Sequence, residues 1–202
     1  MRYKKIFLLM LLALWSLGTA TGIYVLGRYE FTAGEAVNDI SEWPESLTMP
    51  FVAGRMNLVV MAHPHCPCSK ASLEELNNAL AAVPLQPYVR LVYYRPPGVT
   101  AAWSQSELVA ESRRLSGIAV IFDEDGKIAE TLGARTSFDV FLFNASRQII
   151  FRGGITRGRG IYGANPGRRA LEAALRGETA AKMYPVYGCP LRNNPKNFPG
   201  KV

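Results

Sequence analysis

Thiols and imidazoles, which serve as nucleophiles and metal ligands, are crowded into one short stretch of this chain. From Val59 to Lys70 the sequence reads VVMAHPHCPCSK, so an apolar run ends in two histidines, two prolines and two cysteines. Leu73, Leu76 and Leu80 then follow the 3.6-residue period of a helix. This pattern predicts a strand, a sharp turn and a helix, with the reactive side chains at the junction.

The first cysteine of this stretch is the candidate nucleophile. Proline is favoured at the first position of a helix, and Pro67 in that position would make Cys66 the N-cap. A thiolate there would face the unpaired N–H groups of Cys68 and Ser69 and the positive end of the helix dipole. Such surroundings lower a cysteine pKa and increase the reactive thiolate. The competing interpretation of Cys66 is a buried, inert thiol.

The other two cysteines have less certain roles. Cys68 lies two residues from Cys66, and side chains two apart on a helix diverge, so a disulfide between them needs a non-helical or strained turn. Cys68 is therefore a structural thiol, a strained redox partner or a metal ligand, and we include it with Cys66 among the candidate catalytic residues. Cys189 is a candidate resolving thiol, provided that the C-terminal segment folds back.

A metal site is the rival interpretation of the same stretch. His63, His65, Cys66 and Cys68 offer two imidazoles and two thiols within six positions, a ligand set suited to Cu(I) or Zn(II). Four ligands from one turn would require an unusual geometry. The redox interpretation, in contrast, requires no cofactor.

The N-terminus has the pattern of a membrane anchor. Basic residues in the first five positions precede an almost uncharged apolar segment, Ile6 to Leu26, whose length of about 20 residues can span a bilayer as a helix. The positive flank predicts that the N-terminus lies inside and the body of the protein outside. We expect residues 1–27 to be an uncleaved single-pass anchor. The alternative is a signal peptide cleaved near Gly18-Thr19-Ala20.

Composition sets further limits. The chain has 202 residues, 49% of them hydrophobic, and a net charge of +7, which suits one globular domain with an appendage. Basic residues are not interleaved with aromatic ones in any run, so nucleic acid is not an expected partner. Three cysteines are few for a disulfide scaffold, and their odd number leaves one thiol to be explained in an exported protein.

The rest of the sequence alternates strand-like and helix-like segments. Residues 28–50 mix Gly, Ser, Glu and Pro and are expected to form a linker followed by the first ordered turns. Strands are predicted at 57–62, 89–94, 118–122, 140–143 and 148–151, and helices at 69–83, 103–115, 128–132 and 168–176. This order predicts an α/β domain over 51–177, with a mixed sheet flanked by helices. Residues 178–202 form a C-terminal extension that carries Cys189.

The strand–Cys–helix junction resembles the active-site turn of the thioredoxin superfamily. The HPHCPCS motif, Phe151-Arg152-Gly153-Gly154-Ile155-Thr156 and Gly188-Cys189-Pro190-Leu191 are similar to the RedB-like branch of thioredoxin-fold proteins. Where the usual motif has its second cysteine this chain has Ser69, and where the usual cis-proline stands it has Phe138, preceded by Ser137. The resemblance implies that six residues shape the site: His63, His65, Pro67, Ser69, Ser137 and Phe138.

The implied activity is that of a membrane-anchored thiol–disulfide oxidoreductase on the periplasmic side, with protein or small-molecule thiols and disulfides as partners. Ser69 cannot resolve a mixed disulfide, so Cys68, Cys189 or an external thiol must do so. The alternatives are a copper- or zinc-binding, metallochaperone-like protein, a thiol peroxidase, for which one low-pKa cysteine suffices, and a non-catalytic binding module.

Overall fold

The computed structural model describes residues 2–35, 40–179, 181 and 183–192. The chain divides into two units, Met1–Thr32 and Ala33–Val202, and each is described by itself. The first unit contains helix α1 (Arg2–Phe31), which includes the predicted apolar segment. This helix is long and apolar enough to cross a membrane, with a mean hydropathy of 2.0 over its apolar window and none of that window buried.

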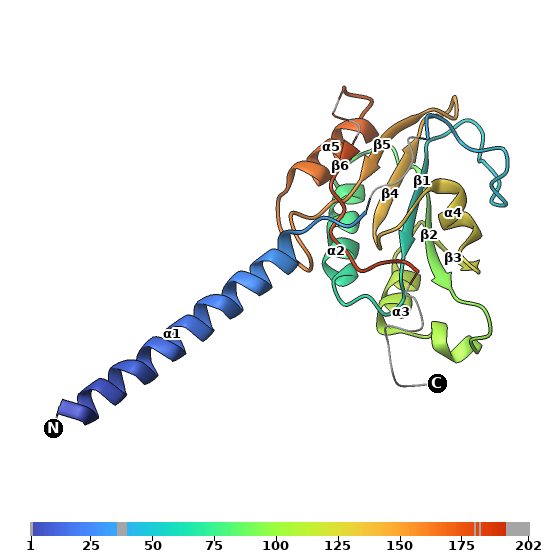
Figure 1. The fold of residues 1–202 in the computed structure, drawn as a ribbon. Coiled ribbons are helices and arrows are strands. Elements are labelled where there is room, and N and C mark those ends of the chain that lie inside the picture. Colours follow the sequence, from blue (N-terminus) through green and yellow to red (C-terminus); the bar gives the residue numbers. More distant parts are fainter. Residues whose placement is uncertain (1, 36–39, 180, 182, 193–202) are drawn as a thin grey trace. The chain divides into compact units, whose positions relative to one another are not determined.

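The second unit is built on a six-stranded mixed sheet with the order β3-β2-β1-β4-β5-β6 (Figure 1). Strands β1, β2 and β3 are parallel, β4 and β5 form an antiparallel hairpin beside β1, and β6 is parallel to β5. The strands are β1 (Asn57–Ala62), β2 (Tyr88–Arg95), β3 (Ile118–Glu124), β4 (Asp139–Phe143), β5 (Ile149–Gly153) and β6 (Met183–Tyr184).

Helices cover both faces of this sheet because its central strand is apolar on both sides. In β1, Leu58 and Val60 join one hydrophobic cluster while Val59 and Met61 join the other, as the two-residue period of a strand requires. The first cluster includes residues of α2, α3 and α5, and the second includes α4. The helices are α2 (Ser69–Ala81), a 3₁₀ turn (Ala101–Ser104), α3 (Glu107–Arg114), α4 (Lys127–Leu132) and α5 (Pro166–Leu175).

The chain order and the sheet order together give a thioredoxin-like fold. A β1–α2–β2 unit with parallel strands is followed by the β4–β5 hairpin and by α5, which packs on the same face as α2. The predicted fold class, a mixed α/β sheet flanked by helices and preceded by an apolar N-terminal helix, is confirmed.

Two segments differ from the sequence-based expectation. The single helix predicted over 103–115 is divided into the 3₁₀ turn and α3, because Ser106 has extended backbone and caps α3 by accepting a hydrogen bond from the Val109 N–H. Part of the expected linker over 28–50 is packed into the domain. There, Trp43, Leu47 and Met49 are buried in the second cluster.

Candidate functional site

The loop between β1 and α2 holds both neighbouring cysteines. It consists of two tight turns, in which the Cys66 N–H donates to the His63 carbonyl at 3.1 Å and the Ser69 N–H donates to the Cys66 carbonyl at 3.1 Å. Helix α2 begins at Ser69, with Cys68 as its N-cap residue. The expectation that Pro67 begins the helix and that Cys66 is its N-cap is therefore wrong, because Pro67 and Cys68 complete a turn before the helix starts.

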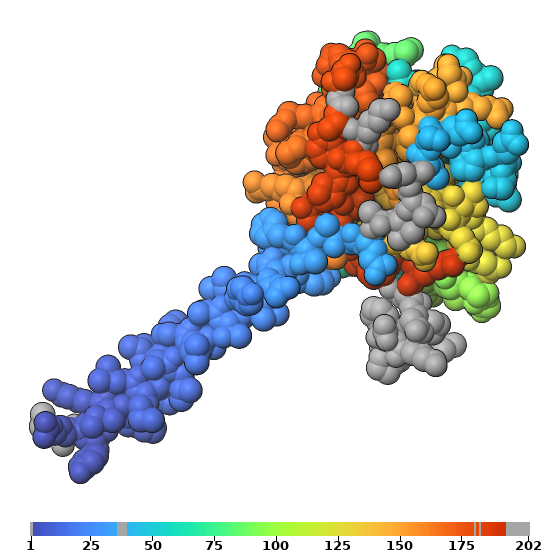
Figure 2. All heavy atoms as spheres, turned by 45° about the horizontal axis from the view of Figure 1, so that its top comes forward, coloured from blue at the N-terminus to red at the C-terminus, as the bar shows by residue number. Residues whose placement is uncertain are grey.

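The C-terminal segment folds back onto this loop. It runs antiparallel to the residues that precede β4, with Thr136 opposite Pro190. The Ser137 N–H donates to the Cys189 carbonyl, and the Leu191 N–H donates to the Arg135 carbonyl, both at 2.8 Å. Residues 183–192, in red in Figure 2, accordingly lie against the surface of the domain. This pairing meets the condition on which a resolving role of Cys189 depends.

Three thiols converge at this point. The sulfur atoms of Cys66, Cys68 and Cys189 all lie within 4.8 Å of one another. All three are free cysteines; Cys66 is only 3% exposed, and the other two are half-buried. Two come from one turn and the third from the C-terminal segment, so the cluster exists only because that segment is docked.

The pKa values of the three thiols separate sharply. Hydrogen bonds from Cys189 and, to a smaller extent, from Cys68 lower the pKa of the Cys66 thiol. Together with a hydrogen bond from Ser69, they outweigh the opposite effect of burial, which raises this pKa. The hydrogen bond between Cys66 and Cys189 raises the pKa of Cys189, with further contributions from Cys68 and from burial. For Cys68, a bond with Cys189 lowers the pKa, but Cys66 and burial raise it overall. The shifts therefore favour the thiolate at Cys66 over a thiolate at either of the other two cysteines.

A buried hydroxyl pair connects the cysteine loop to the segment before β4. Ser69 Oγ lies 2.8 Å from Ser137 Oγ, and the His63 N–H donates to Ser137 Oγ at 2.9 Å. The next residue, Phe138, has a φ of +65° and donates its N–H to the Met61 carbonyl at 2.6 Å. Ser137 therefore holds the loop through its side chain and the Cys189 segment through its backbone.

Neither histidine belongs to the group of ligand atoms that lie within 4.8 Å of one another among the described residues. His65 Nε2 is 2.7 Å from the Trp103 carbonyl, and the His65 N–H donates to His63 Nδ1 at 3.1 Å. Burial lowers the pKa of His63 to about 4, so this imidazole is neutral at pH 7. In the described part of the chain, the three thiols are the one group of His, Cys, Asp or Glu ligand atoms gathered closely enough for a metal ion. The rival metal interpretation of the sequence grouped His63, His65, Cys66 and Cys68, whereas the ligand atoms that converge belong to Cys66, Cys68 and Cys189.

Two contacts at the site were not anticipated from the sequence. The Trp103 ring packs edge-on against both imidazoles, with centroid distances of 5.7 Å to His63 and 4.8 Å to His65. Arg159 Nε donates to the Gly188 carbonyl at 3.1 Å, next to Cys189. No local motif marks either residue, because both reach the site from distant loops.

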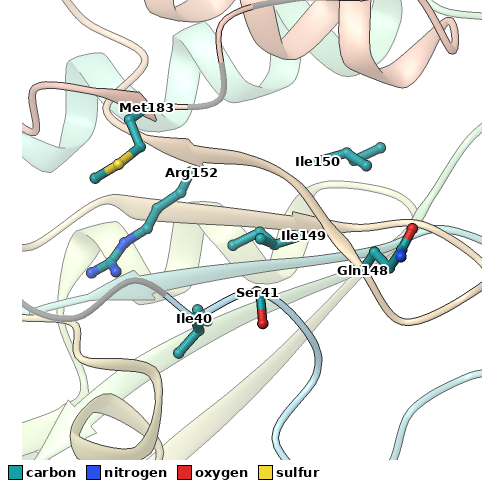
Figure 3. A pocket seen from close by; sticks show the side chains of 7 residues that line it. All are labelled: Ile40, Ser41, Gln148, Ile149, Ile150, Arg152 and Met183. Atoms are coloured by element: carbon teal, nitrogen blue, oxygen red, sulfur yellow. The ribbon is translucent and has the colours of Figure 1, made fainter.

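Two cavities help to locate the chemistry. One of about 340 Å³ opens beside the cysteine loop and is lined by Pro64, His65, Cys66, Pro67, Lys70, Ser106, Glu107, Leu108 and Glu111. A second, of about 450 Å³, is lined by the seven residues in Figure 3, which include Arg152 and Met183 but no cysteine. Of these two cavities, the first is lined by Cys66 and the second by no cysteine.

No family model matches this chain, and no curated protein matches its sequence. Among solved structures it is similar to an uncharacterized conserved protein of Geobacillus kaustophilus, with a TM-score of 0.56 and 18% identity over 82% of this chain and 94% of that chain. A hypothetical protein of Sinorhizobium meliloti has a TM-score of 0.50 and 20% identity over 79% and 93%. A secreted disulfide oxidoreductase of Mycobacterium tuberculosis has a TM-score of 0.44 and 14% identity over 62% and 83%. The first two likenesses establish a shared fold.

Proposed function

We propose that this protein is a thiol–disulfide oxidoreductase in which Cys66 is the nucleophile. The observation that carries the proposal is the convergence of three free sulfur atoms within 4.8 Å around a nearly buried Cys66. Thiol donors around this sulfur favour its thiolate, which is the form that attacks disulfides. A structural thiol has no need of two further thiols as its neighbours.

The reaction has two exchange steps. The Cys66 thiolate attacks one sulfur of a substrate disulfide, forms a mixed disulfide and releases the other substrate sulfur as a thiolate. A second thiol of the cluster then loses its proton to solvent or to the released thiolate and attacks the Cys66 sulfur. This step forms an intramolecular disulfide and releases the second substrate thiolate. The substrate gains two electrons and the protein loses two; the same steps in reverse oxidise a substrate dithiol.

We assign the resolving role to Cys189. Its segment is fixed by two backbone hydrogen bonds, and its thiol is the strongest influence on the Cys66 pKa. A disulfide between Cys66 and Cys68 would close a very small ring across Pro67 within one turn, where disulfide geometry is strained. Cys68 then serves as the second hydrogen-bond donor to the thiolate.

The cellular setting is also part of this proposal. Helix α1 would anchor the protein as a single-pass segment, and the basic residues before it would keep the N-terminus in the cytoplasm. The thiols would then act on the periplasmic side, where disulfide chemistry is maintained. The HPHCPCS motif supports a relationship to the RedB-like branch of the thioredoxin-fold proteins.

Trapping of the mixed disulfide tests the function. The full chain, reduced and purified in detergent, is mixed with a disulfide reagent, and the adduct is identified by mass spectrometry. The adduct should form on Cys66 and should be lost in Cys66→Ser. It should persist longer in Cys189→Ser than in Cys68→Ser. Absence of any adduct on Cys66 in Cys189→Ser, which lacks the proposed resolving thiol, would refute the proposal.

The same sulfur cluster favours binding of a soft metal ion as a second candidate function. Three thiolates are suitable ligands for Cu(I) or Zn(II), and the sulfur atoms are already near one another. If this function is correct, the reduced protein retains one equivalent of metal after dialysis, and Cys189→Ser abolishes retention while His65→Ala does not. Metal-free protein after anaerobic dialysis would exclude it.

A further inference from the structure

The backbone segment from Arg135 to Ser137 is a short strand edge beside the nucleophile. It presents a carbonyl at Arg135 and an N–H at Ser137, the pair of groups to which an extended peptide adds as an antiparallel strand. In this chain both groups are already bonded, to the Leu191 N–H and the Cys189 carbonyl at 2.8 Å each. The C-terminal segment thus occupies the edge as a peptide ligand would.

This segment, residues 186–191, is fixed at several points along its length. The Gly34 N–H donates to the Val186 carbonyl at 2.8 Å, and Arg159 holds the Gly188 carbonyl. The Leu191 side chain is fully buried in the second hydrophobic cluster, on the face of the sheet covered by α4. Gly188 packs so tightly that a Cβ atom there would lie 2.2 Å from the Ser137 carbonyl oxygen. These contacts dock the segment on the domain through both its backbone and its side chains.

We infer that residues 186–191 are a built-in strand that fills the peptide-binding edge beside Cys66, so that Cys66 exchanges with small-molecule disulfides in preference to extended peptides. The inference rests on the proposed oxidoreductase function and specifies its substrate class. A peptide chain would have to displace Cys189 and the buried Leu191 before it could pair with Ser137. A small disulfide needs no such displacement.

The cavity beside Cys66 offers the route for a small substrate. Its volume of about 340 Å³ falls within the range of small-molecule sites. It is lined by the loop on one side, with Pro64 and Pro67, and by α3 on the other, with Leu108 and Glu111. A small disulfide in this cavity approaches Cys66 without pairing with a strand, and the 186–191 segment stays docked.

Two disulfides that each carry a mercaptoethanol half test the inference on the full chain in detergent. One is hydroxyethyl disulfide; the other is a ten-residue peptide whose single cysteine carries a mercaptoethanol mixed disulfide. The peptide rate is the rate at which the Cys66–peptide mixed disulfide forms, because only this reaction releases mercaptoethanol as hydroxyethyl disulfide does. The unsubstituted protein should react with hydroxyethyl disulfide more than about tenfold faster than with the peptide. Gly188→Ala should push the segment away from Ser137 and raise the ratio of the peptide rate to the hydroxyethyl disulfide rate several-fold. The ratio is compared because any loss of Cys66 thiolate slows both reactions alike.

Gly22→Ala is the matched control, because Gly22 lies in helix α1, has open space around it and has no positive φ. It should leave both rates unchanged. Arg159→Ala removes the hydrogen bond to the Gly188 carbonyl without introducing a steric clash. It should shift the ratio of the two rates in the same direction as Gly188→Ala, and it replaces that variant if Gly188→Ala does not fold. Equal rates with the two substrates in the unsubstituted protein would overturn the inference while leaving the oxidoreductase function intact. Failure of Cys66 to react with either substrate would refute both.

Discussion

The Ser137 N–H donates to the Cys189 carbonyl at 2.8 Å, which joins the segment before β4 to the C-terminal segment of the chain. The Ser137 side chain meanwhile contacts Ser69 Oγ and the His63 N–H. One buried residue thus sets the position of both cysteine-bearing segments. Its contacts explain how Cys189, a cysteine remote in sequence, comes to lie beside Cys66.

Removal of the Ser137 hydroxyl should destabilise the domain. Ser137→Ala leaves the buried His63 N–H and the Ser69 hydroxyl without this partner, and an unsatisfied buried polar group costs about 1–3 kcal/mol. The free energy of unfolding, measured by urea denaturation, should fall by that amount. Ser146→Ala, at an exposed position in the β4–β5 hairpin, is the control. Equal stability of the two variants would show that the hydroxyl pair does not hold the loop.

Cys66 should react as a thiolate at mildly acidic pH. Because its pKa is lowered by hydrogen bonds from Cys189 and Cys68, its apparent pKa in alkylation should lie below the ~8.5 of a free thiol. At pH about 6 it should be alkylated faster than Cys68 or Cys189, both of which have raised pKa values. Alkylation followed by peptide mapping measures this order. A Cys66 that reacts only after denaturation would instead be a structural thiol.

The buried pair of Asp139 and Arg152 should make stability depend on pH. Burial raises the Asp139 pKa from 3.8 to about 6, against the Arg152 charge 3.2 Å away. A raised pKa in the folded state means that the folded protein favours the protonated carboxyl group. The stability that Asp139 contributes through this preference is fully present below pH 3.8 and is lost as pH rises through about 6. The change amounts to roughly 3 kcal/mol, at about 1.4 kcal/mol for each pH unit between the two pKa values.

Comparison with Asp139→Asn measures this effect. His63 titrates over the same range with the opposite sign, because its lowered pKa makes stability fall as pH falls from 6.5 towards 4. Both proteins contain His63, so its contribution drops out of the difference between their unfolding free energies. This difference should decrease between pH 4 and pH 6 and then level off. A difference that is constant with pH would contradict a raised Asp139 pKa.

A buried ion pair should anchor α5 to α2. Arg168 contacts Glu75 at 2.8 Å, and Glu75, which is 2% exposed, also accepts the Gly163 N–H at 2.7 Å. Arg168→Met leaves a buried carboxylate without its cation, a loss that typically costs about 3–5 kcal/mol. Arg176→Met, which removes an exposed pair with Glu178, should leave unfolding unchanged. Similar urea midpoints for the two variants would show that the Glu75 pair does not support the fold.

A reporter fused after Val202 tests the orientation in the membrane. The basic N-terminal flank and apolar helix α1 lead us to expect activity of an alkaline phosphatase fusion, which requires export. A fluorescent reporter that matures only in the cytoplasm should remain dark. Cytoplasmic fluorescence would contradict the proposed periplasmic setting.

The sequence predicts most of the sheet because local patterns of apolar and turn residues indicate its strands. The apolar run that ends at Ala62, the leucine period after it and the turn at 144–147 all depend on neighbouring residues. They correctly placed β1, α2 and the β4–β5 hairpin. The assignment of Pro67 as the first helical residue, with Cys66 as the N-cap, was wrong because a proline also suits a turn before a helix, and Pro67 occupies such a turn.

The site depends on pairings that no local pattern encodes. Cys189 could be named as a candidate from residue type alone, but its position results from backbone bonds to Arg135 and Ser137. The Trp103 contact with His65 and the burial of Trp43 likewise join segments far apart in sequence. Such contacts follow from tertiary packing, which the periodicity of single segments does not contain.

The connectivity of the three cysteines in the oxidised protein tests the central claim most directly. The full chain is oxidised with a mild disulfide reagent, its free thiols are alkylated, and its peptides are mapped by mass spectrometry without reduction. We predict a disulfide between Cys66 and Cys189, with Cys68 alkylated. Three alkylated cysteines, or a disulfide that leaves out Cys66, would contradict the account.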